Sequence, residues 1–245
     1  MRLDKFVAYA GFCTRSEARK LIQSGSVFVE GRKITDAGYN LSEQEKQQIQ
    51  VGGKPLHGET TLYYILNKPD GYLTALEDKR LPTIADLLPV ELIYKGLSPV
   101  GRLDYHTTGL LILTNDGTLS HRLTSPKWHI PKVYEIVHEG LPITDKEIQL
   151  FAEGLTLTDK DEHPQTLKPA ELTYQTDTTA VLILTEGKTH QVRRMFAAIQ
   201  RPVLELRRIR IGPIRLASLP EGSFRPFDKE ELRCLQEAAG LSIES

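Results

Sequence analysis

The segment GRLDYHTTGLLILTNDG contains an acid, Asp104, that is a candidate nucleophile or general base. An ionised carboxylate can attack an electrophilic carbon or remove a proton. Asp104 follows an irregular, proline-containing segment and precedes the apolar run 110–113, so we expect it on a loop at a sheet edge. An aspartate in front of a strand is more often a turn or capping residue. Spacing alone therefore does not give Asp104 a catalytic role.

The other reactive side chains show no metal or disulfide motif. Four histidines lack the spacing of metal ligands, and we interpret them as polar pocket or surface residues: His106, His121, His129 and His190. Cys13 and Cys234 lie near opposite ends of the chain and have no C-x-x-C spacing, so both are interpreted as reduced and structural. The sequence predicts no metal site.

The composition is that of an ordinary globular protein, with 245 residues, 40% hydrophobic and 26% charged. No apolar run approaches the ~20 residues that span a bilayer, and no secretory signal is recognisable, so we expect a cytoplasmic protein without membrane contact. The net charge is −1, but residues 1–33 contain seven Lys and Arg against three acids. Residues 188–215 contain eight Lys and Arg against one acid, Glu205. Two basic regions favour a nucleic-acid-binding face, although solvated surface is also typical of such runs.

The N-terminal sequence predicts two helices and a hairpin. The apolar face of RLDKFVAYAG indicates a helix that ends at Gly11. Thr14 and Glu17 have the spacing of a capping box at the start of a second helix. Alternating apolar residues on either side of the turn in SVFVEGRKIT indicate a hairpin.

This segment, MRLDKFVAYAGFCTRSEARKLIQSGSVFVEGRKI, resembles the S4 RNA-binding domain over residues 1 to about 48. Arg15 and Arg19 stand four residues apart on the second helix with Lys20 beside them, away from its apolar face. The resemblance implies that these three cations contact RNA phosphates, which gives affinity and salt dependence but little sequence choice. A two-helix cap with solvated charges is the alternative.

A glycine- and proline-rich segment, VGGKPLHGET, predicts a boundary between an S4-like domain with its linker (1–58) and a larger domain (59–245). Strands are predicted in TLYYILNKP, GLLILTNDG and KVYEIVHEG, and helices over 144–153, 189–199 and 228–239. Runs of strands with scattered helices predict the α+β class.

Four segments of the larger domain occur in a characteristic order: NKPDGY, GRLDYHTTGLLILTNDG, KVYEI and LTEGKTHQVRRMF. Together they resemble the pseudouridine synthase family, in the type that has an S4 domain in front. The resemblance spans nearly the whole chain. It implies a small S4-like α/β domain, then a mixed, mainly antiparallel catalytic sheet that isomerises a uridine in ribosomal RNA without a cofactor.

By position, the resemblance implies catalytic roles for Asp104, Tyr134 and Arg193. Pseudouridine formation breaks the C1′–N1 bond of uridine, turns the uracil and joins C5 to C1′. Asp104 would attack C1′ or remove the C2′ proton, and the sequence does not choose between these routes. Tyr134 would stack on the base and serve proton transfer at C5. A neighbouring cation favours an ionised carboxylate, and Arg193 is expected to pair with Asp104 and orient it.

The uridine must leave its stack, so the protein should hold the flanking RNA. Further RNA contacts are expected from Arg102, Lys132, Arg194, Arg207, Arg208 and Arg210, and from Lys68, which with Pro69 would shape the pocket wall. A solvated helix face is the alternative for Arg193 and Arg194. The segment SHRLTSPKWHIPKVYEI favours 16S rRNA, or a small-subunit assembly intermediate, as the partner of a monomeric enzyme.

Three alternatives remain at this stage. Related enzymes with the same layout modify 23S rRNA. A noncatalytic S4-type RNA-binding protein would tolerate changes at Asp104. A glycosidase-type hydrolase would need a second carboxylate, for which Asp116 is the nearest candidate, although its Asn-Asp-Gly turn explains it equally well.

Overall fold

The computed structural model describes every residue except 12, 43, 57–60, 159–163 and 242–245. The chain divides into two compact units. The first unit comprises Met1–Leu62 and Leu88–Ser98, and the second comprises Tyr63–Leu87 and Pro99–Ser245. No helix within the described residues is both long enough and apolar enough to cross a membrane.

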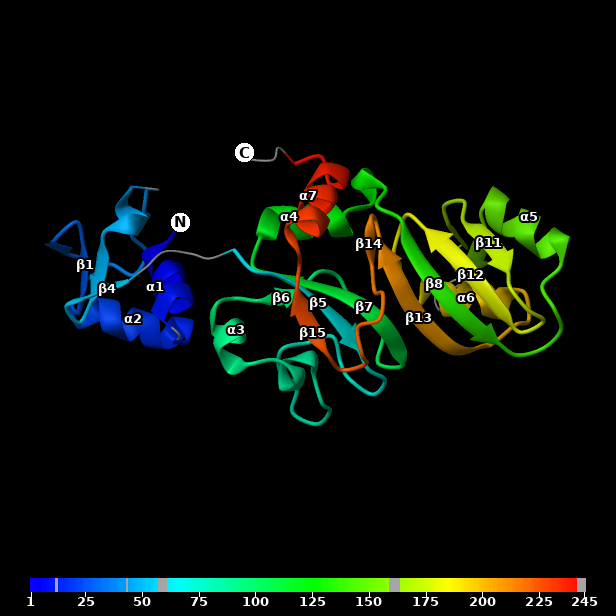
Figure 1. Cartoon of the computed structure of the whole chain (residues 1–245), viewed down its shortest axis with the longest axis horizontal. Helices are drawn as coiled ribbons and strands as arrows, with labels where there is room; N and C mark the ends of the chain where they lie inside the picture. Colours follow the sequence, from blue (N-terminus) through cyan, green and yellow to red (C-terminus); the bar gives the residue numbers. More distant parts are fainter. Residues whose placement is uncertain (12, 43, 57–60, 159–163, 242–245) are drawn as a thin grey trace. The chain divides into compact units, whose positions relative to one another are not determined.

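The first unit contains a four-stranded antiparallel sheet with the helices Leu3–Gly11 and Arg15–Gln23 beside it (Figure 1). The helices are α1 (Leu3–Gly11), α2 (Arg15–Gln23), η1 (Glu45–Gln47) and α3 (Val90–Tyr94). The strands, in the order β2-β1-β3-β4, are β1 (Val27–Val29), β2 (Arg32–Lys33), β3 (Ile49–Val51) and β4 (Lys54–Leu56). The core is formed by apolar residues of α1, α2, β1 and β3, among them Phe6, Ile22 and Ile49.

The helix and hairpin predictions for this unit are confirmed. The Thr14 hydroxyl accepts from the Glu17 amide, and the Glu17 carboxylate accepts from the Thr14 amide, so α2 begins with a complete capping box. One part of the predicted boundary is wrong. Gly52 and Gly53 lie between β3 and β4, where both have positive φ, because a tight turn between paired strands needs the left-handed region.

A buried acid in α1 holds three arginines of the first unit. The Asp4 side chain is fully buried and accepts from Arg2, Arg15 and Arg19 at 3.1, 3.2 and 3.0 Å. Burial alone would raise the pKa of the Asp4 carboxyl, but the three guanidinium hydrogen bonds outweigh it and hold this pKa well below its usual range. Arg15 and Arg19 remain half exposed, yet part of their charge is neutralised within the unit by Asp4.

Replacing Asp4 with Asn should destabilise the first unit by about 2 kcal/mol, because hydrogen bonds to a charged group are lost. A carboxyl whose pKa falls on folding stabilises the fold above its unfolded value of 3.8, so the difference between the proteins should persist at neutral pH and shrink below pH 3.8. Amide hydrogen exchange in residues 3–23 would measure the difference in stability between Asp4→Asn and the wild-type protein. Glu30→Gln, which breaks an exposed pair with Arg32, is the control and should change exchange little. Unchanged exchange in Asp4→Asn would contradict this account.

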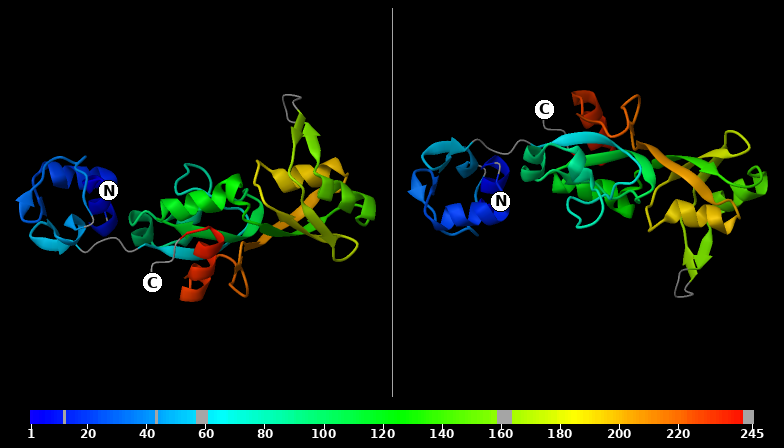
Figure 2. Two further views of the ribbon diagram at one scale, coloured as in Figure 1. Left: turned by 90° about the horizontal axis from the view of Figure 1, so that it is seen from above. Right: turned by 90° about the horizontal axis from the view of Figure 1, so that it is seen from below.

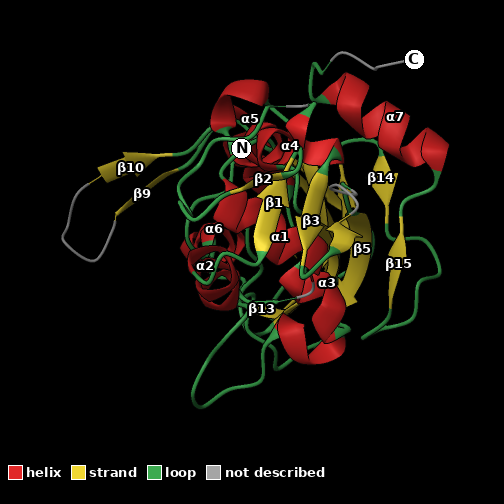
Figure 3. Ribbon diagram, turned by 90° about the vertical axis from the view of Figure 1, so that its left-hand side faces the viewer, coloured by secondary structure: helices red, strands yellow, loops and turns green. Residues whose placement is uncertain are grey.

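The second unit is built on a mixed, mainly antiparallel sheet, as expected for the α+β class. Its main path has the order β11-β12-β8-β13-β7-β5-β15, and only β13 and β7 of these pair in parallel among the described residues. The strands are β5 (Tyr63–Lys68), β6 (Ser98–Pro99), β7 (Thr107–Thr114), β8 (Lys132–His138), β9 (Thr156–Thr158), β10 (Pro164–Thr166), β11 (Glu171–Tyr174), β12 (Thr179–Leu184), β13 (Val203–Ile211), β14 (Ile214–Arg215) and β15 (Phe224–Pro226). The hairpin of β9 and β10 projects from the rest of this unit (Figures 2 and 3).

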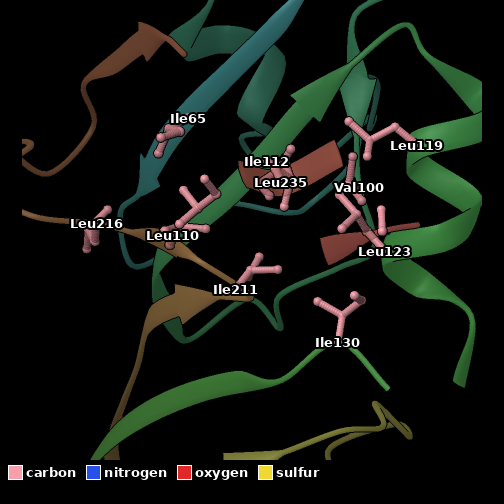
Figure 4. Packing of buried hydrophobic residues seen from close by; sticks show 12 residues of the cluster. Ile65, Val100, Leu110, Ile112, Leu119, Leu123, Ile130, Ile211, Leu216 and Leu235 are labelled. Atoms are coloured by element: carbon pink, nitrogen blue, oxygen red, sulfur yellow. The ribbon is translucent and has the colours of Figure 1, made fainter. Parts of the chain in front are cut away.

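The helices of the second unit are η2 (Ile84–Leu87), α4 (Gly117–Thr124), η3 (Pro126–Trp128), α5 (Asp145–Glu153), α6 (Gln191–Ala198) and α7 (Lys229–Ala238). The three predicted long helices are confirmed, since α5, α6 and α7 fall within their predicted ranges. Buried side chains of β5, β7 and β13 pack with those of α4 and α7 in one core, whose members include Ile65, Ile112, Ile211, Leu119 and Leu235 (Figure 4). A second contact joins α5 to α6 through the edge-to-face rings of Phe151 and Phe196.

Arg122 caps the C-terminal end of α7. The Arg122 guanidinium donates to the carbonyls of Ala239 and Gly240. The same guanidinium lies 4.2 Å from the ring centroid of Trp128. These contacts satisfy carbonyls that have no partner within the helix and join α7 to α4 and η3.

Candidate active site

Asp104 lies on the loop that leads into β7, and its side chain is about one-third exposed, at 36%. The expectation of a loop is confirmed, but the expectation of a sheet edge is wrong. β7 runs between β13 and β5, and Leu110 to Leu113 are fully buried. A strand that is apolar on both faces is typical of the interior of a sheet. The acid therefore lies three residues before a central strand of the sheet.

A buried lysine fixes the loop that contains Asp104. Lys68, at the end of β5, is 0% exposed, and its ammonium donates to the carbonyls of Pro69, Tyr105 and Thr107 at 3.0, 3.1 and 2.9 Å. Burial lowers the pKa of Lys68 to about 8. All three donors are used inside the protein, which contradicts the predicted RNA contact by Lys68. Its role is to hold the backbone immediately after Asp104.

Gly109 allows the Asp104 loop to continue into a close strand pair. β7 and β13 run in parallel, with Gly109 opposite Arg208. Gly109 has φ +100°, and a Cβ atom there would lie 2.3 Å from the Arg208 carbonyl oxygen. Only glycine fits both the backbone conformation and the space.

Arg193 does not form the expected pair with Asp104. Its guanidinium donates to the carbonyls of Val203 and His106, at 3.1 and 3.0 Å. Arg193 therefore connects α6 to the Asp104 loop by a hydrogen bond to the backbone of His106, two residues beyond Asp104. Among the described residues, one basic group lies within ion-pair distance of the Asp104 carboxylate: Nε2 of His190, at 3.6 Å.

His190 is a neighbour of Asp104 for which the sequence predicts only a polar pocket or surface position. It occupies the N-cap position of α6 with φ 48° and makes no side-chain capping bond. A left-handed backbone is uncommon for a residue with a side chain and costs free energy. Here it accompanies an imidazole directed at the carboxylate. No local sequence signal indicates this, because the contact depends on how α6 meets the β7 loop.

Two cavities meet at Asp104. The larger, of about 1420 Å³, is lined by Asp104 with Arg193 and Arg207. The smaller, of about 550 Å³, is lined by Asp104 with Tyr134, which is 8% exposed. His190 also lines both. Each of the two predicted partners thus shares a cavity with Asp104, but Tyr134 and Arg193 line different ones.

The predicted RNA contacts differ in how accessible they are. Arg102 and Arg207 are exposed, and Arg210 is half-buried. Arg194 donates to the side chain of Gln165 on β10, at 3.1 Å, rather than standing free.

Two further cations are shielded from the surface. Arg208 is 2% exposed and donates through Nε to the Leu110 carbonyl, at 2.8 Å, so a contact with a phosphate on the protein surface is contradicted. Lys132 is half-buried in the smaller cavity, where its ammonium reaches the Ile130 carbonyl at 3.4 Å.

Asp116, the second carboxylate that a hydrolase would need, has a structural role. Its Oδ1 accepts from the amides of Thr118 and Leu119 at the start of α4, and its Oδ2 accepts from the Tyr63 hydroxyl. It is a helix cap, as its turn sequence suggested. The hydrolase alternative therefore loses its candidate.

Comparisons with known proteins agree with this geometry. The RNA pseudouridylate synthase family matches residues 62–198, and the S4 domain matches residues 1–47. The fold and site therefore define an RNA pseudouridine synthase, an isomerase. The chain belongs to the RNA pseudouridine synthase family, in the type that begins with an S4 domain.

Individual relatives match over nearly their full length. The ribosomal small subunit pseudouridine synthase A of Escherichia coli is 39% identical over 95% of this chain and 98% of its own. An uncharacterised RNA pseudouridine synthase of Bacillus subtilis is 38% identical over 97% of this chain and 99% of its own. A crystal structure of a pseudouridylate synthase superimposes with a TM-score of 0.66 at 36% identity, over 96% of this chain and 99% of that one.

Proposed function

We propose that this protein isomerises a specific uridine in 16S rRNA and that Asp104 is its essential catalytic residue. One observation carries the proposal: Asp104 presents a partly exposed carboxylate where two cavities meet, on a loop that Lys68 holds in place. The target follows from the similarity to the Escherichia coli small-subunit enzyme. A 23S rRNA target is the alternative.

The proposed chemistry needs little beyond an oriented carboxylate. Asp104 either attacks C1′ or removes the C2′ proton, and in both routes the uracil leaves with the electron pair of the C1′–N1 bond. Tyr134 stacks on the base in the smaller cavity. Arg193 is a positioning residue in this scheme, because it holds the His106 carbonyl of the same loop.

The flanking RNA is gripped by cations that remain accessible. In the second unit these include Arg102, Arg207 and Arg210. In the first unit Lys20 and the outer faces of Arg15 and Arg19 contact phosphates. The proposed domains are 1–58 for RNA binding and 59–245 for catalysis, in a monomer that acts on rRNA or an assembling small subunit in the cytoplasm.

The target is tested by incubating the purified protein with 16S and 23S transcripts and mapping pseudouridine at single-nucleotide resolution. We expect one 16S uridine to be converted, and the same site to be unmodified in cells that lack the gene. Conversion of a 23S site with 16S unchanged would overturn the target but retain the reaction. The opposite result is a protein that binds both transcripts but converts neither of them, and also converts no uridine in small-subunit assembly intermediates. That result would overturn the catalytic proposal and indicate a noncatalytic RNA-binding protein.

A further inference from the structure

Two cations in the smaller cavity have no acidic partner. Arg208 on β13 is 2% exposed, and its Nη2 atom is buried without a hydrogen-bond partner. Lys132 on β8 donates to the Ile130 carbonyl, at 3.4 Å. Within the described part of the chain, no carboxylate lies within ion-pair distance of either residue. Buried charges are normally paired, so an unmatched pair of cations indicates an anionic ligand.

The strand register directs these cations to the face that holds the expected base-stacking residue. Arg208 lies opposite Tyr134 in the antiparallel pair of β13 and β8. Lys132 precedes Tyr134 by two residues on β8, and alternate residues of a strand point to the same face. All three line the smaller cavity together with Asp104. The cations therefore lie beside the space that a uracil ring would occupy.

The charge balance of this cavity is strongly positive. Its lining includes Asp104 as the one acid among the described residues, against four lysine and arginine side chains: Arg102, Lys132, Lys188 and Arg208. Burial in the first place, and the charge of Arg208 in the second, lower the pKa of Lys132 to about 8. Two like charges that repel each other in a partly buried cavity are stabilised when an anion binds between them.

We propose that Lys132 and Arg208 form an anion subsite that holds the uracil ring and stabilises its negative charge when the C1′–N1 bond breaks. The inference rests on the proposed function and extends it to the leaving group. As C1′–N1 breaks, its electron pair passes to N1 and is delocalised onto the O2 and O4 atoms of the ring. C5 of the turned uracil then bonds to C1′. In the first route this bond displaces the Asp104 carboxylate. In the second route C5 adds to C1′ of the C1′–C2′ double bond, and Asp104 returns to C2′ the proton that it removed. C5 loses its proton and N1 gains one, so the isomerisation balances without a co-reactant. Donors fixed where charge develops lower the barrier most.

The first test separates chemistry from RNA binding. Removing one such donor typically costs about 10²-fold in kcat. We expect Lys132→Met to lose about that much kcat on the rRNA transcript, with KM within about threefold. Lys132→Arg should recover most of the lost kcat, and Lys146→Met, on the exposed face of α5, is the matched control. A loss confined to KM would show a phosphate contact instead and would overturn the proposal, as would an undiminished kcat.

The second test uses pH. The groups that face Lys132 in the cavity are Arg208 of β13, Tyr134 of β8, Arg102 and Asp104 of the β7 loop, and Lys188 and His190 before α6. Lys132 loses its proton as the pH rises through about 8, so kcat should fall there. In Lys132→Arg the fall should move to higher pH, because guanidinium stays protonated. If kcat of Lys132→Arg falls at the same pH as that of the wild-type protein, deprotonation of Lys132 does not cause the fall and the proposal is overturned.

A third test does not depend on turnover. The ligand is 5-fluorouracil, and ¹⁹F NMR near neutral pH reports whether the bound ring is neutral or ionised. We expect the wild-type protein to bind the ionised ring preferentially, and Lys132→Met to show no such preference. Arg208→Gln is a parallel variant, and Lys132→Met keeps the test valid if Arg208→Gln does not fold. If the wild-type protein binds the anion but converts no rRNA, the proposed function fails and the subsite stands. If it converts rRNA and Lys132→Met changes neither kcat nor anion binding, the subsite fails and the function stands.

Discussion

Replacing Asp104 with Asn should abolish uridine conversion and leave RNA binding within about twofold of wild type. Asn matches Asp in shape but cannot ionise, so it can neither attack C1′ nor accept the C2′ proton. Loss of a residue that reacts directly with its substrate commonly lowers the rate by about 10⁴-fold or more. Conversion on a 16S transcript and binding of the same transcript by filter retention would measure the two properties separately.

The fold supports this separation of activity from binding. Lys68 holds the loop through the carbonyls of Tyr105 and Thr107, and neither bond involves the Asp104 side chain. Asp116→Asn is the matched control, because Asn is also a good N-cap residue and should keep α4 and the activity intact. Conversion by Asp104→Asn would refute the catalytic role. Parallel loss of conversion and binding would instead indicate that Asp104 is structural.

Gly109→Ala should destabilise the second unit by about 3 kcal/mol or more. A left-handed backbone costs a residue with a Cβ about 1–2 kcal/mol. The new methyl group would also lie 2.3 Å from the Arg208 carbonyl oxygen, a backbone atom that cannot move without separating β7 from β13. Thermal unfolding followed by circular dichroism would report the loss, and conversion should fall because Asp104 and Arg208 depend on this strand pair.

Gly117→Ala provides the comparison for Gly109→Ala. Gly117 begins α4, and a Cβ atom there would meet no atom within 4 Å. Because Ala favours helix more than Gly does, this variant should be at least as stable as wild type. Equal stability of the two variants would show that the β7–β13 contact adapts, contrary to the geometry.

Local signals predicted much of the fold. The predicted pair Thr14–Glu17 forms a complete capping box at the start of α2. Thr144 and Glu147 form another at the start of α5, within the helix predicted over 144–153. A capping box involves residues three apart, and its partners are therefore visible in the sequence. The glycines of VGGKPL were misleading, because a hairpin turn and a domain boundary have the same composition.

The candidate site was harder to predict, because its contacts join distant segments. Lys68 and Arg208 are predicted from the sequence to contact RNA, but both are buried, which is rare for lysine and arginine. Lys68 is buried because carbonyls 37 and 39 residues further along the chain accept from it. Likewise, the partners of Arg193 depend on how α6 meets β13 and the β7 loop. No pattern within one segment contains that information.

The contact between Arg122 and the only tryptophan of the chain determines what intrinsic fluorescence can report. The indole of Trp128 packs against the core of the second unit beneath a guanidinium that also grips the end of α7. Its emission should therefore shift when α7 detaches or the second unit melts. The first unit contains no tryptophan, so its unfolding should not change the tryptophan emission. A single-step fluorescence transition would thus describe only one of the two units.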